Sequence, residues 1–267
     1  MKPNHENVSV ETSDNVAIVR YSNQPSGLMT RKGAELLLNA LQPLTEDTSV
    51  NAVVLTGGDE DVFIRHASVG QIIRAAEALR QEQVPRDIFS TTAYFHLLQL
   101  LDNSPKPVIA AINGTCMGGG FEIALGCTYR IASQQVQHIG LPEIKLGIFP
   151  GSGGTQRLRD LLGVHHARAF ILRGRVVNAT TALEIGLVDE VAPSALDQAV
   201  VVARELAARS PAAIRSILQL TKSNPDSRAT GLMDEARVFA DLLLEDDVGI
   251  DIMIRFEEQG LLLNELE

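Results

Sequence analysis

Three consecutive glycines, Gly118 to Gly120, stand between an apolar run at residues 107–112 and a short helical pattern that contains Glu122. Glycine has no side chain, so a ligand or another backbone segment can come very close to it. The start of a helix also leaves free N–H groups and a positive dipole end, which can hold a developing negative charge on oxygen. Glu122 lies one turn inside this helix start. A tight turn that packs a helix on a strand explains the same residues, so the turn alone leaves its role open.

Length and charge restrict the kinds of protein that this chain can be. Its 267 residues suffice for one large domain, and an apolar content of 45% allows a packed core. A formal net charge of −10 and an aromatic content of 4% argue against a surface for nucleic acids. Two cysteines, Cys116 and Cys127, are too few for a disulfide framework and suit a reducing cytosol. The polar N-terminus and the lack of a long uncharged apolar run predict a cytoplasmic protein without a membrane span.

Apolar periodicity and turn residues predict a mixed αβ chain as far as residue 192, followed by helices only. The predicted strands cover residues 8–11, 16–21, 50–56, 62–64, 107–112, 129–133 and 187–191. The predicted helices cover 30–43, 68–82, 87–101, 121–125, 152–162, 164–173, 180–185, 194–209, 212–221, 228–244 and 248–259. We expect a core with the active site over residues 1–192 and a helical oligomerisation region over residues 193–267.

Five motifs, in this order along the chain, resemble those of the crotonase family, the enoyl-CoA hydratase/isomerase superfamily. They are KPVIAAING at 106–114, GGGFE at 118–122, LPEIKLG at 141–147, FPGSGGTQR at 149–157 and ALEIGLVDEV at 182–191. The resemblance implies an α/β fold, a crotonase-like spiral of ββα units that form two sheets. It also implies a C-terminal helical region through which subunits assemble as a homotrimer or a dimer of trimers.

In that family a thioester carbonyl lies between two backbone N–H groups, which stabilise an enolate. By resemblance, the two donors are Gly119 and Arg65, and Glu122 and Glu143 handle a water molecule and a proton. Adding water to a conjugated thioester needs such a base, such an acid and a site for negative charge on oxygen. The resemblance implies further substrate contacts by Ile64, His66, Ala67, Gly118, Gly147 and Pro150. It implies no metal and no separate cofactor, because coenzyme A is part of the substrate.

The loop at residues 65–68 departs from the family, which has small residues there. Arginine, histidine and serine occupy the alanine, glycine and aspartate positions. We expect Arg65 either to clash with coenzyme A or to bind one of its phosphates. His66 is either an added acid–base or hydrogen-bonding group or an exposed loop histidine. The basic C-terminal tail of the family is also missing, which predicts weaker or different binding of the phosphates.

We therefore predict an enzyme, a hydratase (lyase) or isomerase of fatty acid metabolism that acts on an acyl-CoA. Its expected reaction is the syn addition of water to a 2-enoyl-CoA. Two alternatives stay open. A CoA-independent β-diketone hydrolase on the same fold would break a C–C bond with the help of His66 and His138, although both glutamates count against it. A binding protein without catalysis would keep the trimer and lack the activity.

Overall fold

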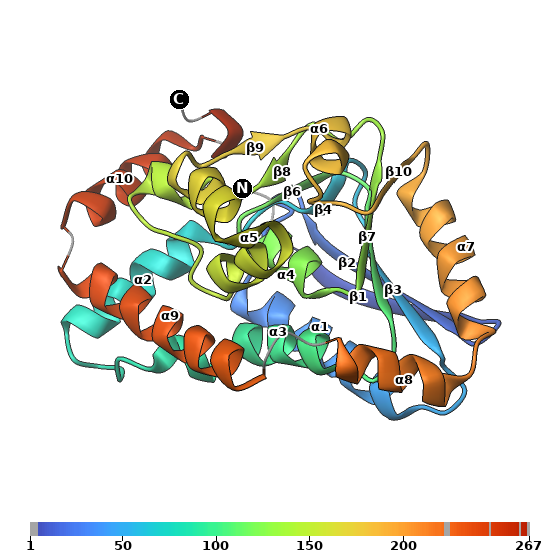
Figure 1. The fold of residues 1–267 in the computed structure, drawn as a ribbon. Coiled ribbons are helices and arrows are strands. Elements are labelled where there is room, and N and C mark those ends of the chain that lie inside the picture. Colours follow the sequence, from blue (N-terminus) through green and yellow to red (C-terminus); the bar gives the residue numbers. More distant parts are fainter. Residues whose placement is uncertain (1–4, 222–224, 246, 262, 266–267) are drawn as a thin grey trace.

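The computed structural model describes residues 5–221, 225–245, 247–261 and 263–265 (Figure 1). The strands of this part are β1 (His5–Ser13), β2 (Val16–Gln24), β3 (Ala52–Gly57), β4 (Val62–Ile64), β5 (Val108–Ile112), β6 (Thr115–Met117), β7 (Tyr129–Ser133), β8 (Ile139–Gly140), β9 (Val176–Val177) and β10 (Glu190–Ala192). The helices are α1 (Arg31–Glu46), α2 (Val69–Arg80), α3 (Ala93–Asn103), α4 (Gly119–Gly126), α5 (Gly154–Leu172), α6 (Ala179–Glu184), α7 (Ala195–Ala207), α8 (Pro211–Leu220), α9 (Pro225–Glu245) and α10 (Asp247–Gln259). Short 3-10 helices are η1 (Ile88–Thr91), η2 (Glu143–Leu146) and η3 (Leu263–Glu265).

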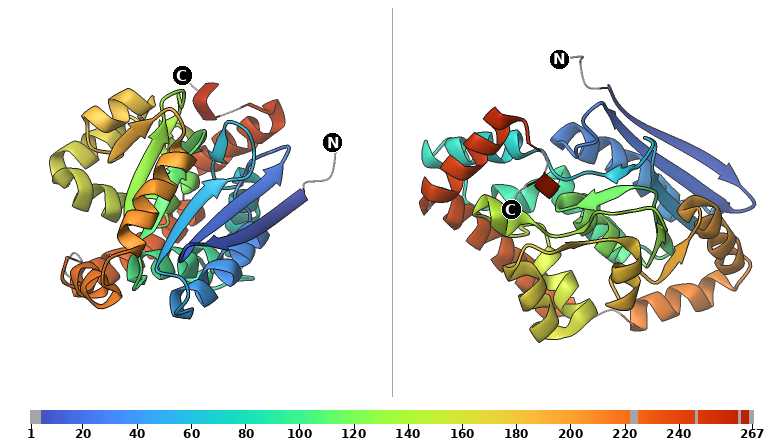
Figure 2. Two further views of the ribbon diagram at one scale, coloured as in Figure 1. Left: turned by 90° about the vertical axis from the view of Figure 1, so that its right-hand side faces the viewer. Right: turned by 90° about the horizontal axis from the view of Figure 1, so that it is seen from above.

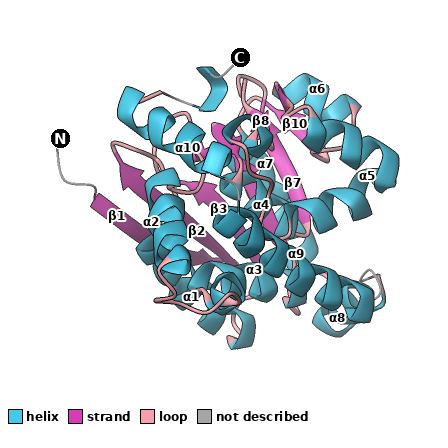
Figure 3. Ribbon diagram, turned by 90° about the vertical axis from the view of Figure 1, so that its left-hand side faces the viewer, coloured by secondary structure: helices cyan, strands magenta, loops and turns pink. Residues whose placement is uncertain are grey.

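The strands form two sheets, and the chain alternates between them. The larger sheet has the order β1-β2-β3-β5-β7-β10, and the smaller one has the order β4-β6-β8-β9. Three successive strand pairs, β3–β4, β5–β6 and β7–β8, each place one strand in each sheet. Neighbours from β2 to β10 pair in parallel, whereas β1 pairs with β2 in antiparallel fashion, with β1 at the sheet edge (Figures 2 and 3). This alternation confirms the predicted α/β spiral of ββα units.

Both faces of the larger sheet are buried, which explains its continuous apolar strands. In β3, Val53 and Leu55 pack with α1 and α3 on one face, and Ala52 and Val54 face α7 on the other. The alanines of α7 let this helix lie close on the strands (Figure 1). Helix α7 therefore belongs to the packing of the core sheet, although it follows the boundary predicted at residue 192.

Local signals placed most elements correctly. Asp14 and Asn15 adopt positive φ angles of 53° and 62° between the paired residues Ser13 and Val16, so the predicted hairpin is present. Thr30 caps α1, because the Gly33 N–H donates to its hydroxyl. Helices α7 to α10 follow β10, as predicted, and no strand follows it in the described part of the chain.

Three local predictions were wrong. Pro43 lies inside α1, which continues to Glu46: the proline removes one helical hydrogen bond near the helix end, and the Asp47 N–H still donates to Pro43 O. The helix predicted over residues 87–101 is divided at Thr92, whose hydroxyl caps α3. The segment before the glycines contains the short strand β6, which pairs with both β4 and β8.

No helix in the described part of the chain is long and apolar enough to cross a membrane.

Candidate active site

The glycine turn brings the start of α4 against the end of β4. Gly118 has a φ of +51°, which favours glycine, and its N–H donates to Gly140 O at 2.9 Å. A side chain at Gly120 would place its Cβ only 2.0 Å from Ile64 O. The glycines therefore permit a close approach of two backbone segments, which was one of the two readings of the sequence.

The backbone of Gly119 lies close to that of Ala67 at this contact. A Cβ built on Gly119 would lie 3.2 Å from Ala67 N and 2.9 Å from Ala67 Cβ. Gly119 is the first residue of α4, so the helix itself offers its N–H no acceptor. Among the described residues, neither the Gly119 N–H nor the Ala67 N–H donates to an acceptor.

Arg65, the residue predicted as the second donor, is engaged elsewhere. Its N–H donates to Gly27 O at 2.8 Å, and its Nε donates to Ser26 O at 3.0 Å. The parallel bridge between Met29 and Ala67 fixes this register, with the Met29 N–H on His66 O and the Ser68 N–H on Met29 O. In this register the N–H of Ala67, two residues further along, has no acceptor among the described residues.

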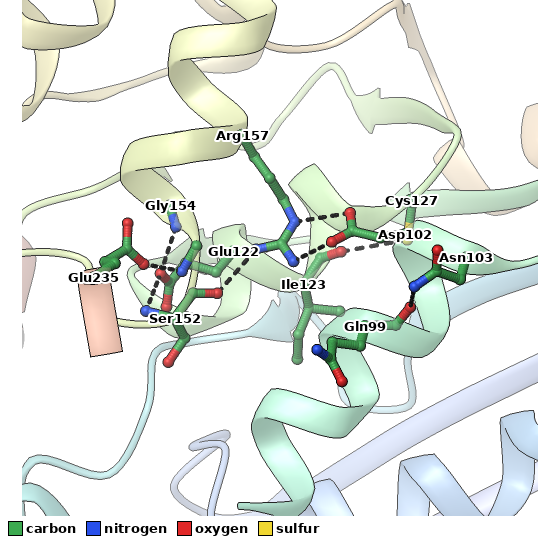
Figure 4. A network of polar contacts seen from close by, with 11 residues as sticks. Gln99, Asp102, Asn103, Glu122, Ile123, Cys127, Ser152, Gly154, Arg157 and Glu235 are labelled. Carbon is green, nitrogen blue, oxygen red and sulfur yellow. Dashed lines mark hydrogen bonds and ion pairs between the residues drawn. The ribbon is translucent and has the colours of Figure 1, made fainter. Parts of the chain in front are cut away.

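Glu122 lies in the first turn of α4 and is 3% exposed. Its Oε1 accepts hydrogen bonds from the N–H groups of Ser152 and Gly154, at 2.9 and 2.8 Å (Figure 4). Burial raises the pKa of this carboxyl above its usual value, and the two N–H donors and the nearby Arg157 guanidinium oppose this rise without cancelling it. The site thus contains a buried carboxyl with donors that favour its ionised form.

Glu143 opens η2 and is 9% exposed. Its Oε2 is buried and has no hydrogen-bond partner among the described residues. Burial raises the pKa of Glu143 well above its usual value, and the charge of Glu122 raises it further. The two neighbouring carboxyls therefore differ in their surroundings: two N–H groups donate to Glu122, whereas Glu143 Oε2 has no donor among the described residues.

A cavity of about 560 Å³ joins these groups. Six of the residues predicted for the site line it: Glu122, Glu143, Gly118, Gly119, His66 and Ala67. One wall is apolar and includes Phe89, Phe149 and Phe239, whose rings contact edge to face at 5.0 and 5.4 Å. Arg31 and Arg74 also line the cavity and supply positive charge.

The other four predicted site residues, Ile64, Arg65, Gly147 and Pro150, do not line this cavity. The Ile64 side chain is buried in the core between the sheets and helices. Gly147 ends η2 with a φ of +75° and packs on Gly249 of α10. Pro150 packs against Gly154. Each of these residues shapes the backbone beside the cavity without facing it.

His66 is buried and faces the cavity, so the interpretation as an exposed loop histidine is wrong. Its Nδ1 lies 2.8 Å from Ala67 O, and its ring lies edge to face with Phe256 of α10 at 6.3 Å. A carbonyl can only accept, so Nδ1 carries the proton and donates. Burial lowers the pKa of His66 to about 4, which keeps the imidazole neutral at physiological pH.

Comparison with known proteins shows which family the chain belongs to. The family described as enoyl-CoA hydratase/isomerase matches residues 11–261 of the chain. The chain belongs to the enoyl-CoA hydratase/isomerase family. The predicted membership of the crotonase superfamily is thereby confirmed.

The chain is similar to YngF of Bacillus subtilis (strain 168), a protein described as an enoyl-CoA hydratase/isomerase. The two are 40% identical over 212 residues, which cover 77% of this chain and 78% of YngF. The structure of Pseudomonas aeruginosa DspI is similar, with a TM-score of 0.72, 32% identity and coverage of 91% of this chain and 97% of DspI. The carnitinyl-CoA hydratase of Mycobacterium avium has a TM-score of 0.79, 26% identity and coverage of 94% and 95%.

Several residues of this enoyl-CoA hydratase/isomerase family site were missed from the sequence. Tyr94 lines the cavity, and its hydroxyl donates to Gly119 O. Arg157 holds Asp102 through two contacts of 3.0 and 2.6 Å and donates to Ser152 O. Glu235, from α9, is buried beside Glu122 (Figure 4). Two of these residues had a detectable signal: Arg157 ends the motif FPGSGGTQR, and Glu235 is an acidic residue on the same helical face as Leu232 and Phe239.

Proposed function

We propose that this family member adds water to a 2-enoyl-CoA thioester. The observation that carries the proposal is the pair of dissimilar carboxyls, Glu122 and Glu143, in one cavity with two free N–H groups. The thioester oxygen lies between the N–H groups of Gly119 and Ala67, where the negative charge of the enolate develops. Ala67 thus takes the role that the sequence had given to Arg65.

Each carboxyl has one task in the reaction. Glu122, held in its ionised form by the Ser152 and Gly154 N–H groups, takes a proton from water as the water oxygen attacks the β-carbon. The electron pair of the double bond moves onto the thioester oxygen. Glu143, which keeps its proton because of burial and the charge of Glu122, gives that proton to the α-carbon. Exchange with solvent then restores both carboxyls.

The cavity also supports a coenzyme A thioester as the substrate. Its apolar wall suits an acyl chain, and Arg31 and Arg74 offer cations to phosphates. Arg65 does not face the cavity and donates to Ser26 O, so it neither obstructs it nor supplies a cation to it. We expect no cofactor besides the coenzyme A of the substrate, and a homotrimer or dimer of trimers in solution.

The β-diketone hydrolase gains no support from the two histidines. His138 does not line the cavity, and the neutral His66 cannot supply a proton at neutral pH. A C–C bond hydrolysis that depends on these groups would lack its acid. The hydration reaction uses the groups that do line the cavity.

Glu122→Gln and Glu143→Gln test the proposed reaction with crotonyl-CoA as substrate. We expect each change to lower kcat by roughly 10²- to 10⁴-fold, because each removes a proton-transfer group. The parent should show a bell-shaped profile, with the rate lost as pH falls through the pKa of Glu122 and as pH rises through the raised pKa of Glu143.

Glu77→Gln, an exposed carboxyl on α2, serves as the control and should behave as the parent does. Calorimetry with acetoacetyl-CoA, which cannot be hydrated, measures binding apart from turnover. A parent that neither binds acetoacetyl-CoA nor hydrates crotonyl-CoA would contradict the proposal. So would full activity in either glutamine variant.

A further inference from the structure

The proposed reaction leaves one buried carboxyl of the site without a task. Glu235 is 6% exposed and lies on α9, between Leu232 and Phe239 of the same buried face. It does not line the cavity. A buried carboxyl needs hydrogen-bond donors, and those of Glu235 come from a short loop and from the first turn of the helix α5 that follows it.

This loop, residues 152–154, divides its N–H groups between two carboxyls. Ser152 and Gly154 donate to Glu122 Oε1 at 2.9 and 2.8 Å. Gly153, between them, donates to Glu235 Oε1, and the Thr155 hydroxyl donates to Glu235 Oε2. The N–H groups of consecutive residues therefore alternate between Glu122 of α4 and Glu235 of α9, and Figure 4 shows the bonds of Ser152 and Gly154 to Glu122.

The carbonyl side of the loop is held as well. Arg157 Nη1 donates to Ser152 O at 2.9 Å, and the Arg157 N–H donates to Gly153 O at 2.9 Å. Gly153 has a φ of +99°, and a Cβ there would lie 1.9 Å from Arg157 Nη1. Only glycine adopts this backbone conformation easily. The contacts on the N–H side and on the carbonyl side of the loop together hold the loop in this conformation.

We propose that Glu235 is a positioning residue, which fixes the Ser152–Gly154 loop so that its N–H groups hold Glu122 in ionised form and in place. This inference rests on the proposed role of Glu122 as the base. Helix α9, far along the chain, would thereby set the acid–base behaviour of a residue on α4.

Three charged groups near Glu235 interact with it and bear on the pH dependence of the site. They are Glu122 of α4, Glu143 of η2 and Arg157 of α5. Burial raises the pKa of Glu235 to about 8, the charge of Glu122 adds to this, and its two hydrogen-bond donors and Arg157 oppose it. The hydrogen bonds, rather than the charge alone, are the contacts that a test must remove.

Glu235→Ala removes the acceptors of the Gly153 N–H and of the Thr155 hydroxyl, and Glu235→Gln keeps one acceptor for the Gly153 N–H. For Glu235→Ala we expect kcat to fall about 10- to 100-fold with little change in KM, because the base is displaced while the two oxyanion donors stay in place. The acid limb of the pH profile should move to higher pH, since Glu122 loses donors that favour its charge. Glu235→Gln should stay close to the parent in both respects.

Two controls separate positioning from folding. Asp241→Asn, on the same helix, removes a carboxylate that pairs with Arg86 at 3.0 Å on the surface, and should leave the acid limb unchanged. Thr155→Val removes the second contact, together with the bond that Gln156 Nε2 donates to the same hydroxyl at 3.1 Å, and should move the limb in the same direction as Glu235→Ala, by less. If Glu235→Ala does not fold, Thr155→Val still tests the inference.

An active parent whose Glu235→Ala and Thr155→Val variants keep the parental kcat and acid limb would overturn the inference. Equal losses in Glu235→Ala and Glu235→Gln would also overturn it, because the charge and not the hydrogen bond would then matter. An inactive parent would instead contradict the proposed function itself. Binding of acetoacetyl-CoA, unchanged in all variants, shows that the cavity is intact.

Discussion

A methyl group added at Gly119 would separate the two N–H groups that we propose to bind the thioester oxygen. The Cβ of Gly119→Ala would lie 2.9 Å from both Ala67 Cβ and the Tyr94 hydroxyl, and 3.2 Å from Ala67 N. Ordinary contacts begin at 3.4 Å, so the closest neighbours must retreat by about 0.5 Å. Ala67 cannot retreat alone, because its neighbours His66 and Ser68 are both hydrogen-bonded to Met29.

A shift of this size lengthens a hydrogen bond of about 2.9 Å to about 3.4 Å, where little of it remains. Loss of one oxyanion donor costs about 2.7 to 4 kcal/mol, or roughly 10²- to 10³-fold in kcat. We expect this loss with crotonyl-CoA, measured by the disappearance of its conjugated-thioester absorbance. The overpacking should also lower the free energy of unfolding by about 1–3 kcal/mol.

Gly126→Ala, at the other end of α4, is the matched control. Its Cβ would lie 3.3 Å from Leu101 Cβ, far from the cavity, so any effect should fall on stability and not on kcat per folded subunit. If Gly119→Ala kept the kcat of the parent while its stability fell, the two N–H groups would not be the oxyanion site, and our reasoning would be refuted.

Two further predictions concern the neighbourhood of the site. His66→Ala should leave the pH profile unchanged above pH 6, since the pKa of the buried imidazole is about 4 and it stays neutral there. In the unfolded chain this imidazole takes up a proton below its ordinary pKa of 6.5, so the parent should lose stability as pH falls from 6.5 towards 4. Urea titrations at pH 7 and pH 5 measure this loss, and the difference in the free energy of unfolding between the two pH values should be smaller for His66→Ala. Asp102→Ala should lower the free energy of unfolding by about 3–5 kcal/mol, because Arg157, paired with it at 2.6 Å, would remain buried without that partner. Glu205→Ala removes an exposed pair with Arg209 and should change the free energy of unfolding by less than about 1 kcal/mol; equal losses would contradict this account.

Much of the site could be predicted because its signals are local. The triple glycine, the helix start after it and the carboxyl of Glu122 lie within five residues, and Glu143 lies in a motif of its own. The structure brings both carboxyls into one cavity. The prediction for Arg65 does not fit the geometry because register is a long-range property. The pairing of residues 65–68 with residues 27–29 decides which N–H is free, and no local pattern reports it.

The sequence by itself determined the chain of ββα units, the hairpin at Asp14-Asn15, the glycine turn and the family. These depend on alternation, turn residues and motifs, which act over a few residues. The tertiary structure alone decided that Ala67 and not Arg65 faces Gly119, that His66 is buried and neutral, and that Glu235 meets the loop beside Glu122. Each of these depends on segments distant in the chain, whose contact is set by packing of the whole domain.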